Sequence, residues 1–364
     1  MTNSQQKIQD NPNIVTISYS DLLSGRELHA EIGAAFSPEG LGLILVKDCP
    51  EFSAKRTAVL HAIRKFALLP DQVKEAYTVP EASYSIGWSH GKEKMKNGVP
   101  DVAKGSYYAR PLNRDVLTED AELKKKFPEV YCDNVWPRDE LPELEHTFAD
   151  ITRIQVQVGL EICRAFDSYL HQLTGGQHQL GRFYDMIASS ISYLGRMLHY
   201  FPMEPEANTT LDGLCGWHLD HGCITCVLSP LYLDLQGNPQ PKPADCGLHV
   251  KMPANGSIFK IDIPEDCLGI QLGETFQVLS GGHLRATPHC VRSCRDPNIS
   301  REQLALFVAC DPSQNMDTPG YSLPFNDVVD NVFLPEGVPL LRDRLQEATT
   351  YQDFSVNTFK AYLK

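Results

Sequence analysis

The sequence lacks three features that are typical of membrane or secreted proteins: a long apolar run, a signal peptide and a disulfide framework. Its longest early apolar run, LGLILV at 41–46, is far shorter than the roughly 20 residues that cross a bilayer. The opening MTNSQQKIQDNPN has no cationic region followed by an apolar one, as a signal peptide would. The 11 cysteines are an odd count and do not indicate a disulfide framework. We therefore expect a soluble, cytoplasmic protein with reduced thiols.

The chain also has fewer basic than acidic residues. The chain has 33 Lys and Arg against 46 Asp and Glu, a net charge of -13. This balance opposes binding to a polyanion, and no basic stripe with interleaved aromatic residues is present. We expect neither nucleic acid nor a membrane as a partner, and nothing indicates a protein partner. Local basic groups can still bind a small anion.

Neither an internal repeat nor a low-complexity tract divides the chain, which favours one integrated domain. Residues 13–22 and 41–48 alternate as strands do, with helical spacing between them. Helical spacing returns at 54–70, where Pro70 ends the pattern, and most strongly at 142–173. We expect residues 1–185 to form a helical region on the substrate side of a core.

The hydrophobic pattern of the sequence changes after this helical region. Residues 187–311 contain about eight short apolar runs separated by Gly, Pro, Asn and Asp, which indicates an antiparallel jelly roll. We place the core at 186–315 and a helical tail at 316–364. The prediction is an α+β fold, a distorted jelly roll (double-stranded β-helix) wrapped by N-terminal and C-terminal helices. Residues 80–115, rich in Gly, Pro and aromatic residues, are predicted to form a long functional loop.

The stretch GWHLDHGCITCVLSP (216–230) contains the residues best suited to chemistry. Residues two apart on a strand share a face, so His218 and Asp220 can converge while His221 points away. His289, after a Gly-rich turn, can supply a third ligand. Two histidines and one carboxylate form the facial triad of non-haem iron(II) oxygenases. The alternative is a structural histidine satisfied by Asp220 or by the backbone.

Several further motifs follow one another in a family-like order. They are FSPEGLGLILVKD at 36–48, NVWP at 134–137, RMLHYFP at 196–202, GLHVK at 247–251, LGETFQVLSGG at 272–282 and REQLALF at 301–307. Together with the His-x-Asp pair, they make the chain similar to the isopenicillin N synthase-like iron(II), 2-oxoglutarate-dependent oxygenases. The resemblance covers most of the chain.

The resemblance implies an enzyme, a non-haem dioxygenase, with three groups of site residues. The iron ligands and catalytic residues would be His218, Asp220 and His289. The cosubstrate-binding residues would be Arg301, Gln303, Phe201 and His199, with Arg301 pairing with the distal carboxylate of 2-oxoglutarate. The substrate contacts would be Ser106, Tyr108 and Phe307. The expected reaction is hydroxylation, desaturation or cyclisation of a small organic molecule by dioxygen, with release of succinate and carbon dioxide.

The cosubstrate site departs from the family pattern at three positions. Gln303 replaces a serine, Phe201 replaces a tyrosine, and His199 replaces an asparagine. Phe201 cannot donate a hydrogen bond, whereas the Gln303 amide could replace the missing hydroxyl donor. Two alternatives therefore stay open: an iron(II) oxidase of the same fold that uses ascorbate or its own substrate as reductant, and a non-catalytic metal-containing protein that binds small molecules. The substrate is not indicated.

Overall fold

Two β-sheets form the centre of the computed structural model, which describes residues 8–10, 13–92, 100–111, 121–204, 215–244, 246–292, 294 and 296–362. The larger sheet has the order β2 (Thr16–Ser18), β3 (Leu43–Lys47), β12 (Leu268–Leu272), β8 (Ile224–Leu228), β14 (Ile299–Val308), β6 (Tyr193–Tyr200), β5 (Lys104–Ala109) and β4 (Gly87–His90), and β9 (Leu231–Asp234) also pairs with β14. The smaller sheet has the order β1 (Ile8–Asp10), β11 (Ile258–Ile261), β10 (Gly247–Lys251), β13 (His289–Arg292) and β7 (Cys215–His218).

The strands of the predicted core alternate between these sheets as they do in a jelly roll. In the larger sheet β6, β14, β8 and β12 are neighbours, and in the smaller sheet β7, β13, β10 and β11 are neighbours. The chain therefore crosses from one sheet to the other between β6 and β7, and again between β7 and β8. This arrangement brings β7 and β13, which are far apart in sequence, side by side.

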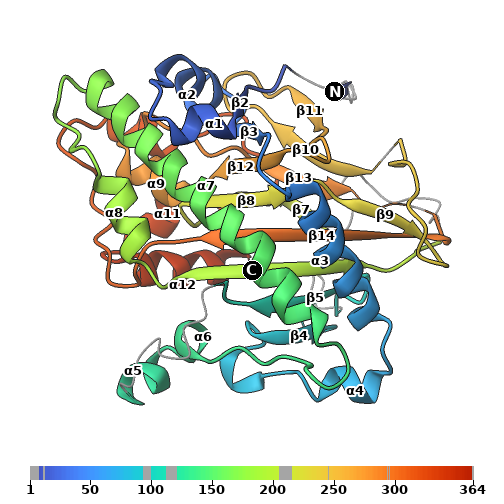
Figure 1. The fold of residues 1–364 in the computed structure, drawn as a ribbon. Coiled ribbons are helices and arrows are strands. Elements are labelled where there is room, and N and C mark those ends of the chain that lie inside the picture. Colours follow the sequence, from blue (N-terminus) through green and yellow to red (C-terminus); the bar gives the residue numbers. More distant parts are fainter. Residues whose placement is uncertain are drawn as a thin grey trace, which may run out of the picture.

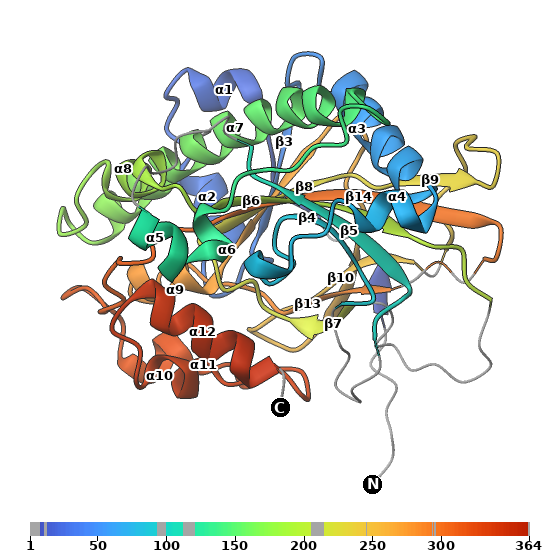
Figure 2. The same cartoon turned by 90° about the horizontal axis from the view of Figure 1, so that it is seen from below.

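Helices precede and follow the core, and one short helix lies within it, between β12 and β13. They are α1 (Tyr19–Leu23), α2 (His29–Phe36), α3 (Phe52–Ala67), α4 (Asp71–Glu75), a short 3-10 helix (Pro80–Ala82), α5 (Ala121–Lys126), α6 (Pro128–Tyr131), α7 (Glu143–Leu173), α8 (Arg182–Ser189), α9 (Glu274–Leu279), α10 (Phe325–Val329), α11 (Leu341–Leu345) and α12 (Tyr351–Tyr362). Helices α3 and α7 pack on each other and on the larger sheet (Figures 1 and 2). Leu219, just after β7, donates its backbone N–H to the hydroxyl of Tyr362 in α12. The long helix predicted at 142–173 is confirmed as α7. Its apolar positions, spaced at helical intervals, are buried against the sheet.

The prediction of a long loop at 80–115 is wrong for much of its described part. Strands β4 and β5 pair with each other, and β5 extends the larger sheet through β6. The glycine content that indicated a loop has a packing role instead. A Cβ on Gly105 would overlap the ring of Trp88, which is 1% exposed, so a glycine in the strand makes room for the buried indole. Residues 93–99 and 112–115 lie outside the described residues.

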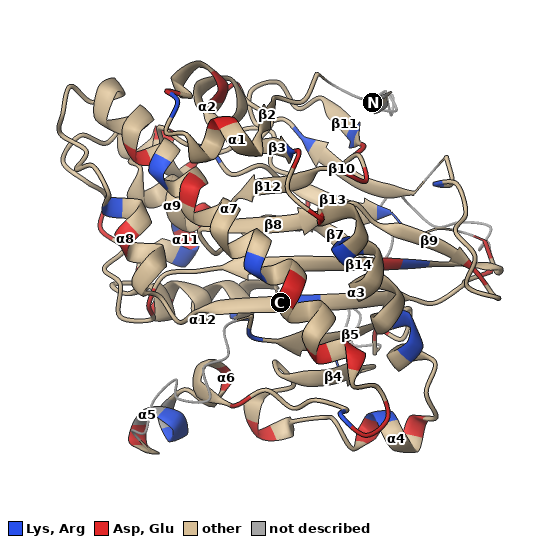
Figure 3. Ribbon diagram, viewed as in Figure 1, with Lys and Arg blue, Asp and Glu red and all other residues tan. Residues whose placement is uncertain are grey.

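Within the described ranges, no helix combines the length and the apolar character needed to cross a bilayer. Basic and acidic residues are interspersed over the helices and loops of the same ranges (Figure 3).

A buried ion pair ties the C-terminal helices to the core. Arg344 of α11 donates to both carboxylate oxygens of Glu274, at 2.6 and 2.5 Å, and both side chains are 2% exposed. The backbone N–H of Glu274 in turn donates to the carbonyl of Asp220 at 2.8 Å. The pair therefore supports the turn that carries Asp220.

Replacing Arg344 by methionine should destabilise the fold strongly, because Glu274 would be left buried without its partner. We expect the free energy of unfolding to fall by about 3–5 kcal/mol, measured by urea denaturation. Arg342→Met is the matched control on the same helix. Its ion pair with Asp330 is about half exposed and should contribute no more than about 1 kcal/mol. Equal losses in the two variants would show that the buried pair has no special role.

Candidate active site

Strand pairing brings the three predicted metal ligands together. His218 is the last residue of β7 and lies directly opposite His289, the first residue of β13. Asp220 follows two residues later, in the turn towards β8. One ligand atom from each residue lies within 4.8 Å of the other two. The Nε2 atoms of His218 and His289 are 3.8 and 3.9 Å from Oδ1 of Asp220.

Hydrogen bonds outside the cluster orient all three side chains. Nδ1 of His218 lies 2.8 Å from the carbonyl of Gly216, and Nδ1 of His289 lies 3.2 Å from that of Thr287. Because a carbonyl only accepts, each ring has its proton on Nδ1, and the Nε2 lone pair points towards Asp220. Thr225 donates to Oδ2 of Asp220 at 2.6 Å, and Oδ1 then faces the two imidazoles.

Charge and burial keep these groups in the protonation states that a metal requires. Burial, with His218 nearby, lowers the pKa of His289 to about 4, so its imidazole is neutral at pH 7. Burial alone would raise the pKa of Asp220, but His289, His218 and the Thr225 hydroxyl outweigh it and lower that pKa. Two imidazoles and one carboxylate on one side of a shared point suit iron(II) with open coordination positions.

The neighbouring candidates in the same stretch lie outside this cluster. His221 contacts Ser355 of α12 at 3.1 Å through Nε2, and burial lowers its pKa to about 4. This is the structural role expected for a residue on the other strand face. Cys223 and Cys226 are buried free thiols, as expected for side chains that do not bind zinc.

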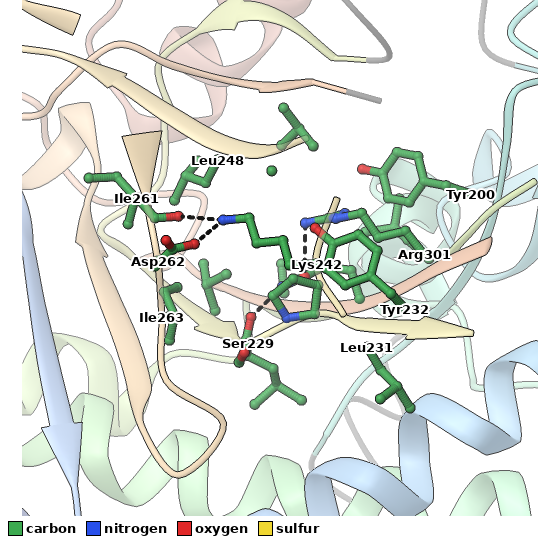
Figure 4. A pocket seen from close by; sticks show the side chains of 18 of the residues that line it. Tyr200, Ser229, Leu231, Tyr232, Lys242, Leu248, Ile261, Asp262, Ile263 and Arg301 are labelled. Atoms are coloured by element: carbon green, nitrogen blue, oxygen red, sulfur yellow. Dashed lines mark hydrogen bonds and ion pairs between the residues drawn. The ribbon is translucent and has the colours of Figure 1, made fainter. Parts of the chain in front are cut away.

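A cavity of about 440 Å³ opens in front of the triad. Figure 4 shows another part of its wall. Its wall includes His218, Asp220 and His289, together with one face of β14. That face consists of alternating residues of the strand: Arg301, Gln303, Ala305 and Phe307. The common face predicted for Arg301 and Phe307 is therefore confirmed, and both side chains share the cavity with the metal cluster.

Arg301 has unused hydrogen-bonding capacity in this wall. The residue is 4% exposed, and in the strand register it stands opposite Tyr200 of β6 and Tyr232 of β9. Its Nη2 donates to Oε1 of Gln303 at 3.1 Å, and the guanidinium lies 4.9 Å from the centre of the Tyr200 ring. Among the described residues, Nε and Nη1 of Arg301 and the hydroxyl of Tyr232 have no hydrogen-bond partner.

Unsatisfied buried donors cost about 1–3 kcal/mol each unless a ligand pairs with them. A carboxylate fits this part of the wall, because Nη1 of Arg301 is open and a guanidinium forms strong charge-assisted hydrogen bonds with carboxylates. Figure 4 shows Arg301 beside Tyr200 and Tyr232, and Lys242 next to them with its amine turned towards Asp262 and Ile261. Lys242 is already bound to Asp262 and to the carbonyl of Ile261. Of these two cations, Arg301 is the one that retains open donors among the described residues.

Gln303 has a different role from the donor role suggested by the sequence. Its Nε2 already donates to the carbonyl of Leu228 at 2.7 Å. This bond turns Oε1 towards Arg301, from which it accepts. The amide therefore positions the arginine and has no obvious donor left for a ligand.

Gln303→Leu should weaken binding of the anion held by Arg301 roughly tenfold, the effect of about 1.4 kcal/mol. The reason is that Nη2 would lose its acceptor and the guanidinium its fixed orientation. Calorimetric titration with 2-oxoglutarate measures this change. Gln303→Glu preserves an acceptor and should retain more of the affinity than leucine, whereas equal losses would contradict a positioning role.

His199 and Phe201 are not among the residues that line the cavity. Strand alternation turns His199 to the other face of β6, where Nδ1 lies 2.8 Å from Oε2 of Glu302. The Phe201 ring packs 4.5 Å from the His199 ring and 5.0 Å from the His90 ring. Tyr200, between them in sequence, faces the cavity instead. Sequence reasoning missed it, although its alternation with Arg196 and Leu198 was an available signal.

Ser106 and Tyr108 also lie outside the lining, in β5. Both contact Arg196, which does line the cavity. Nε of Arg196 donates to Oγ of Ser106 at 3.0 Å, and its guanidinium lies 5.1 Å from the centre of the Tyr108 ring. The structure therefore places these two residues behind the wall, while Phe307 is part of it.

Comparisons of sequence agree with this site. No protein-family model matches the chain. The chain is 30% identical over 163 residues to scopoletin 8-hydroxylase of Arabidopsis thaliana, which is 44% of this chain and 36% of that protein. It is 33% identical over 122 residues to 2-oxoglutarate-dependent dioxygenase 11 of Oryza sativa subsp. japonica, which is 34% of this chain and 29% of that protein. The matched segments thus span about a third of each relative.

Comparisons of structure cover nearly the whole chain. A protein assigned to the 2OG-Fe(II) oxygenase family from Caulobacter crescentus superposes with a TM-score of 0.69 at 21% identity, covering 96% of this chain and 99% of that one. The chain has the fold of the 2OG-Fe(II) oxygenases. A full-length Neurospora crassa protein, in complex with alpha-KG and 5-formyluracil, shares this fold with a TM-score of 0.64 at 18% identity, covering 97% and 98%. The resemblance to 2OG-Fe(II) oxygenases in the sequence is confirmed.

Proposed function

We propose that the chain is an iron(II)- and 2-oxoglutarate-dependent dioxygenase that oxidises a small organic molecule and releases succinate and carbon dioxide. One observation carries this proposal. The same cavity contains a converging His-Asp-His cluster and a buried arginine with two unpaired N–H groups. The first suits iron(II), and the second suits the distal carboxylate of a dicarboxylic keto acid.

The residues of this chain would divide the work between them. His218, Asp220 and His289 would hold iron(II), which when bound supplies the oxidising chemistry with dioxygen. Arg301 would fix the distal carboxylate, with Gln303 holding its Nη2 and Tyr200 stacked on its face. The Tyr232 hydroxyl is an additional donor at that end of the cavity.

The 2-oxoglutarate-independent alternative loses its main support. It rested on Phe201 and Gln303 as departures from the cosubstrate site. Tyr200 brings a phenol to the cavity in place of Phe201, and the open N–H groups of Arg301 do not depend on Gln303 as a donor. The names of relatives also support a hydroxylase or dioxygenase role, with 2-oxoglutarate as cosubstrate. A non-catalytic binding protein would not need a complete ligand set.

The proposal also covers the domain organisation and the cellular compartment of the protein. We infer a distorted jelly roll at 186–315 that carries the iron site, wrapped by helices from 1–185 and 316–364 in one integrated domain. Ten cysteines among the described residues are free thiols, which supports work in a reducing compartment such as the cytoplasm.

A coupled assay tests the proposed activity. The protein is supplied with iron(II), ascorbate, 2-oxoglutarate and dioxygen, and succinate is measured against the 2-oxoglutarate consumed. We expect equimolar succinate that depends on both iron(II) and oxygen. Oxygen consumption without 2-oxoglutarate would favour the oxidase alternative, and no turnover of either would favour the binding protein.

A further inference from the structure

Gln271 of β12 is a buried glutamine in the cavity wall whose amide is unused. The residue is 3% exposed and lines the cavity. Its side-chain amide makes no hydrogen bond to any residue in the described ranges. The amide is part of the cavity wall, so a molecule bound in the cavity can pair with it.

The strand register places Gln271 beside the metal cluster. Gln271 lies directly opposite Thr225 of β8, and Thr225 lies directly opposite Phe307 of β14. All three residues line the cavity and so share one face of the sheet. Thr225 donates to Oδ2 of Asp220 at 2.6 Å. An amide and a phenyl ring therefore flank the threonine that holds a proposed iron ligand.

The distance between Gln271 and Phe307 limits the size of a molecule that can bind between them. Neighbouring strands are about 4.8 Å apart, so the backbones of Gln271 and Phe307 are separated by roughly 10 Å. A molecule of one or two fused rings fits that width. The Phe307 ring offers an apolar face for a flat group, and Gln271 offers a polar edge.

The amide of Gln271 has donors and an acceptor in one plane. The ligand group that matches both side by side is an HN–C=O unit, as in a lactam, an imide or a carboxamide. A glutamine uses the same bidentate pairing when it reads the edge of adenine.

We propose that the substrate is a small planar molecule with an HN–C=O edge, held by Gln271 and packed against Phe307. This inference rests on the proposed function and names the substrate class for the same site. Gln271 would thereby fix which carbon of the substrate lies next to the iron.

Matched probes test this assignment. The protein loaded with iron(II) and 2-oxoglutarate is titrated anaerobically with 2-quinolone and with N-methyl-2-quinolone, which lacks the N–H donor, and binding is followed by calorimetry. We expect the wild type to bind 2-quinolone about tenfold more tightly. Gln271→Leu should abolish this preference, so that the two probes bind about equally. Gln271→Asn should retain part of it.

Gln240→Leu is the control variant for the loss of an amide from the cavity wall. Its Nε2 already donates to Asp234 at 3.1 Å, so the preference for 2-quinolone should persist. Equal binding of the two probes by the wild type, no binding of either, or a preference that survives in Gln271→Leu overturns the inference. Titration of the same proteins with iron(II) and 2-oxoglutarate alone separates this result from failure of the proposed function, because Gln271→Leu should leave both affinities unchanged.

Discussion

Replacing His289 by alanine will abolish stoichiometric iron(II) binding and, with it, consumption of 2-oxoglutarate. The variant removes one of three ligand atoms and leaves His218 and Asp220 with an incomplete site. Changes to groups that only orient a ligand typically cost 10–100-fold in metal affinity, so loss of a ligand should cost more than about 100-fold. Anaerobic equilibrium dialysis against iron(II) measures this affinity.

His221→Ala is the matched control for this variant. It removes an imidazole from the residue next to Asp220, on the side that contacts Ser355. The variant should lose stability but retain iron(II) binding of the same stoichiometry. Iron(II) bound equally well by His289→Ala and the wild type would show that the metal is held elsewhere.

Arg301→Leu will raise the 2-oxoglutarate requirement sharply while leaving iron(II) binding intact. The open Nε and Nη1 groups lie in a buried wall, where loss of one partner of a charge pair costs about 2–5 kcal/mol. This corresponds to a loss of affinity between roughly 30-fold and several thousand-fold. Calorimetric titration of the iron-loaded protein with 2-oxoglutarate gives the value.

Two further variants make this result specific. Arg301→Lys retains the charge but not the fork, and should lie between leucine and the wild type. Arg292→Leu removes an arginine from β13 that does not line the cavity, and should leave the affinity unchanged. If Arg292→Leu weakens binding as much as Arg301→Leu, the distal carboxylate is bound at a different place.

Strand alternation made the metal cluster and the Arg301 face predictable from the sequence. Residues two apart on a strand share a face whatever the tertiary structure, which is sufficient for Arg301 with Phe307. Asp220 lies in the turn after β7, so its approach to His218 also depends on the shape of that turn. The arrival of His289 opposite His218 depends on pairing between β7 and β13. That pairing is non-local, and only the order of motifs along the chain indicated it.

The cosubstrate end was less predictable, because a shift of one residue reverses the face of a strand. The motif HYFP placed Phe201 in the site, whereas the register with β14 turns Tyr200 inward. The role of Gln303 depends on the carbonyl of Leu228, which lies 75 residues away in sequence. Gln271 is a single polar residue in the otherwise apolar strand LGIQL. The sequence alone did not indicate a role for it, because only the structure shows that it lines the cavity.

The most direct test of the account is anaerobic addition of 2-oxoglutarate to the iron(II)-loaded protein, followed by visible absorption. A keto acid chelated to iron(II) gives a charge-transfer band that neither component gives alone. We predict this band in the wild type at one equivalent of each, a shift of its titration to higher 2-oxoglutarate in Arg301→Leu, and its absence in His289→Ala. A wild-type protein that binds iron(II) and shows no band at saturating 2-oxoglutarate would contradict the account.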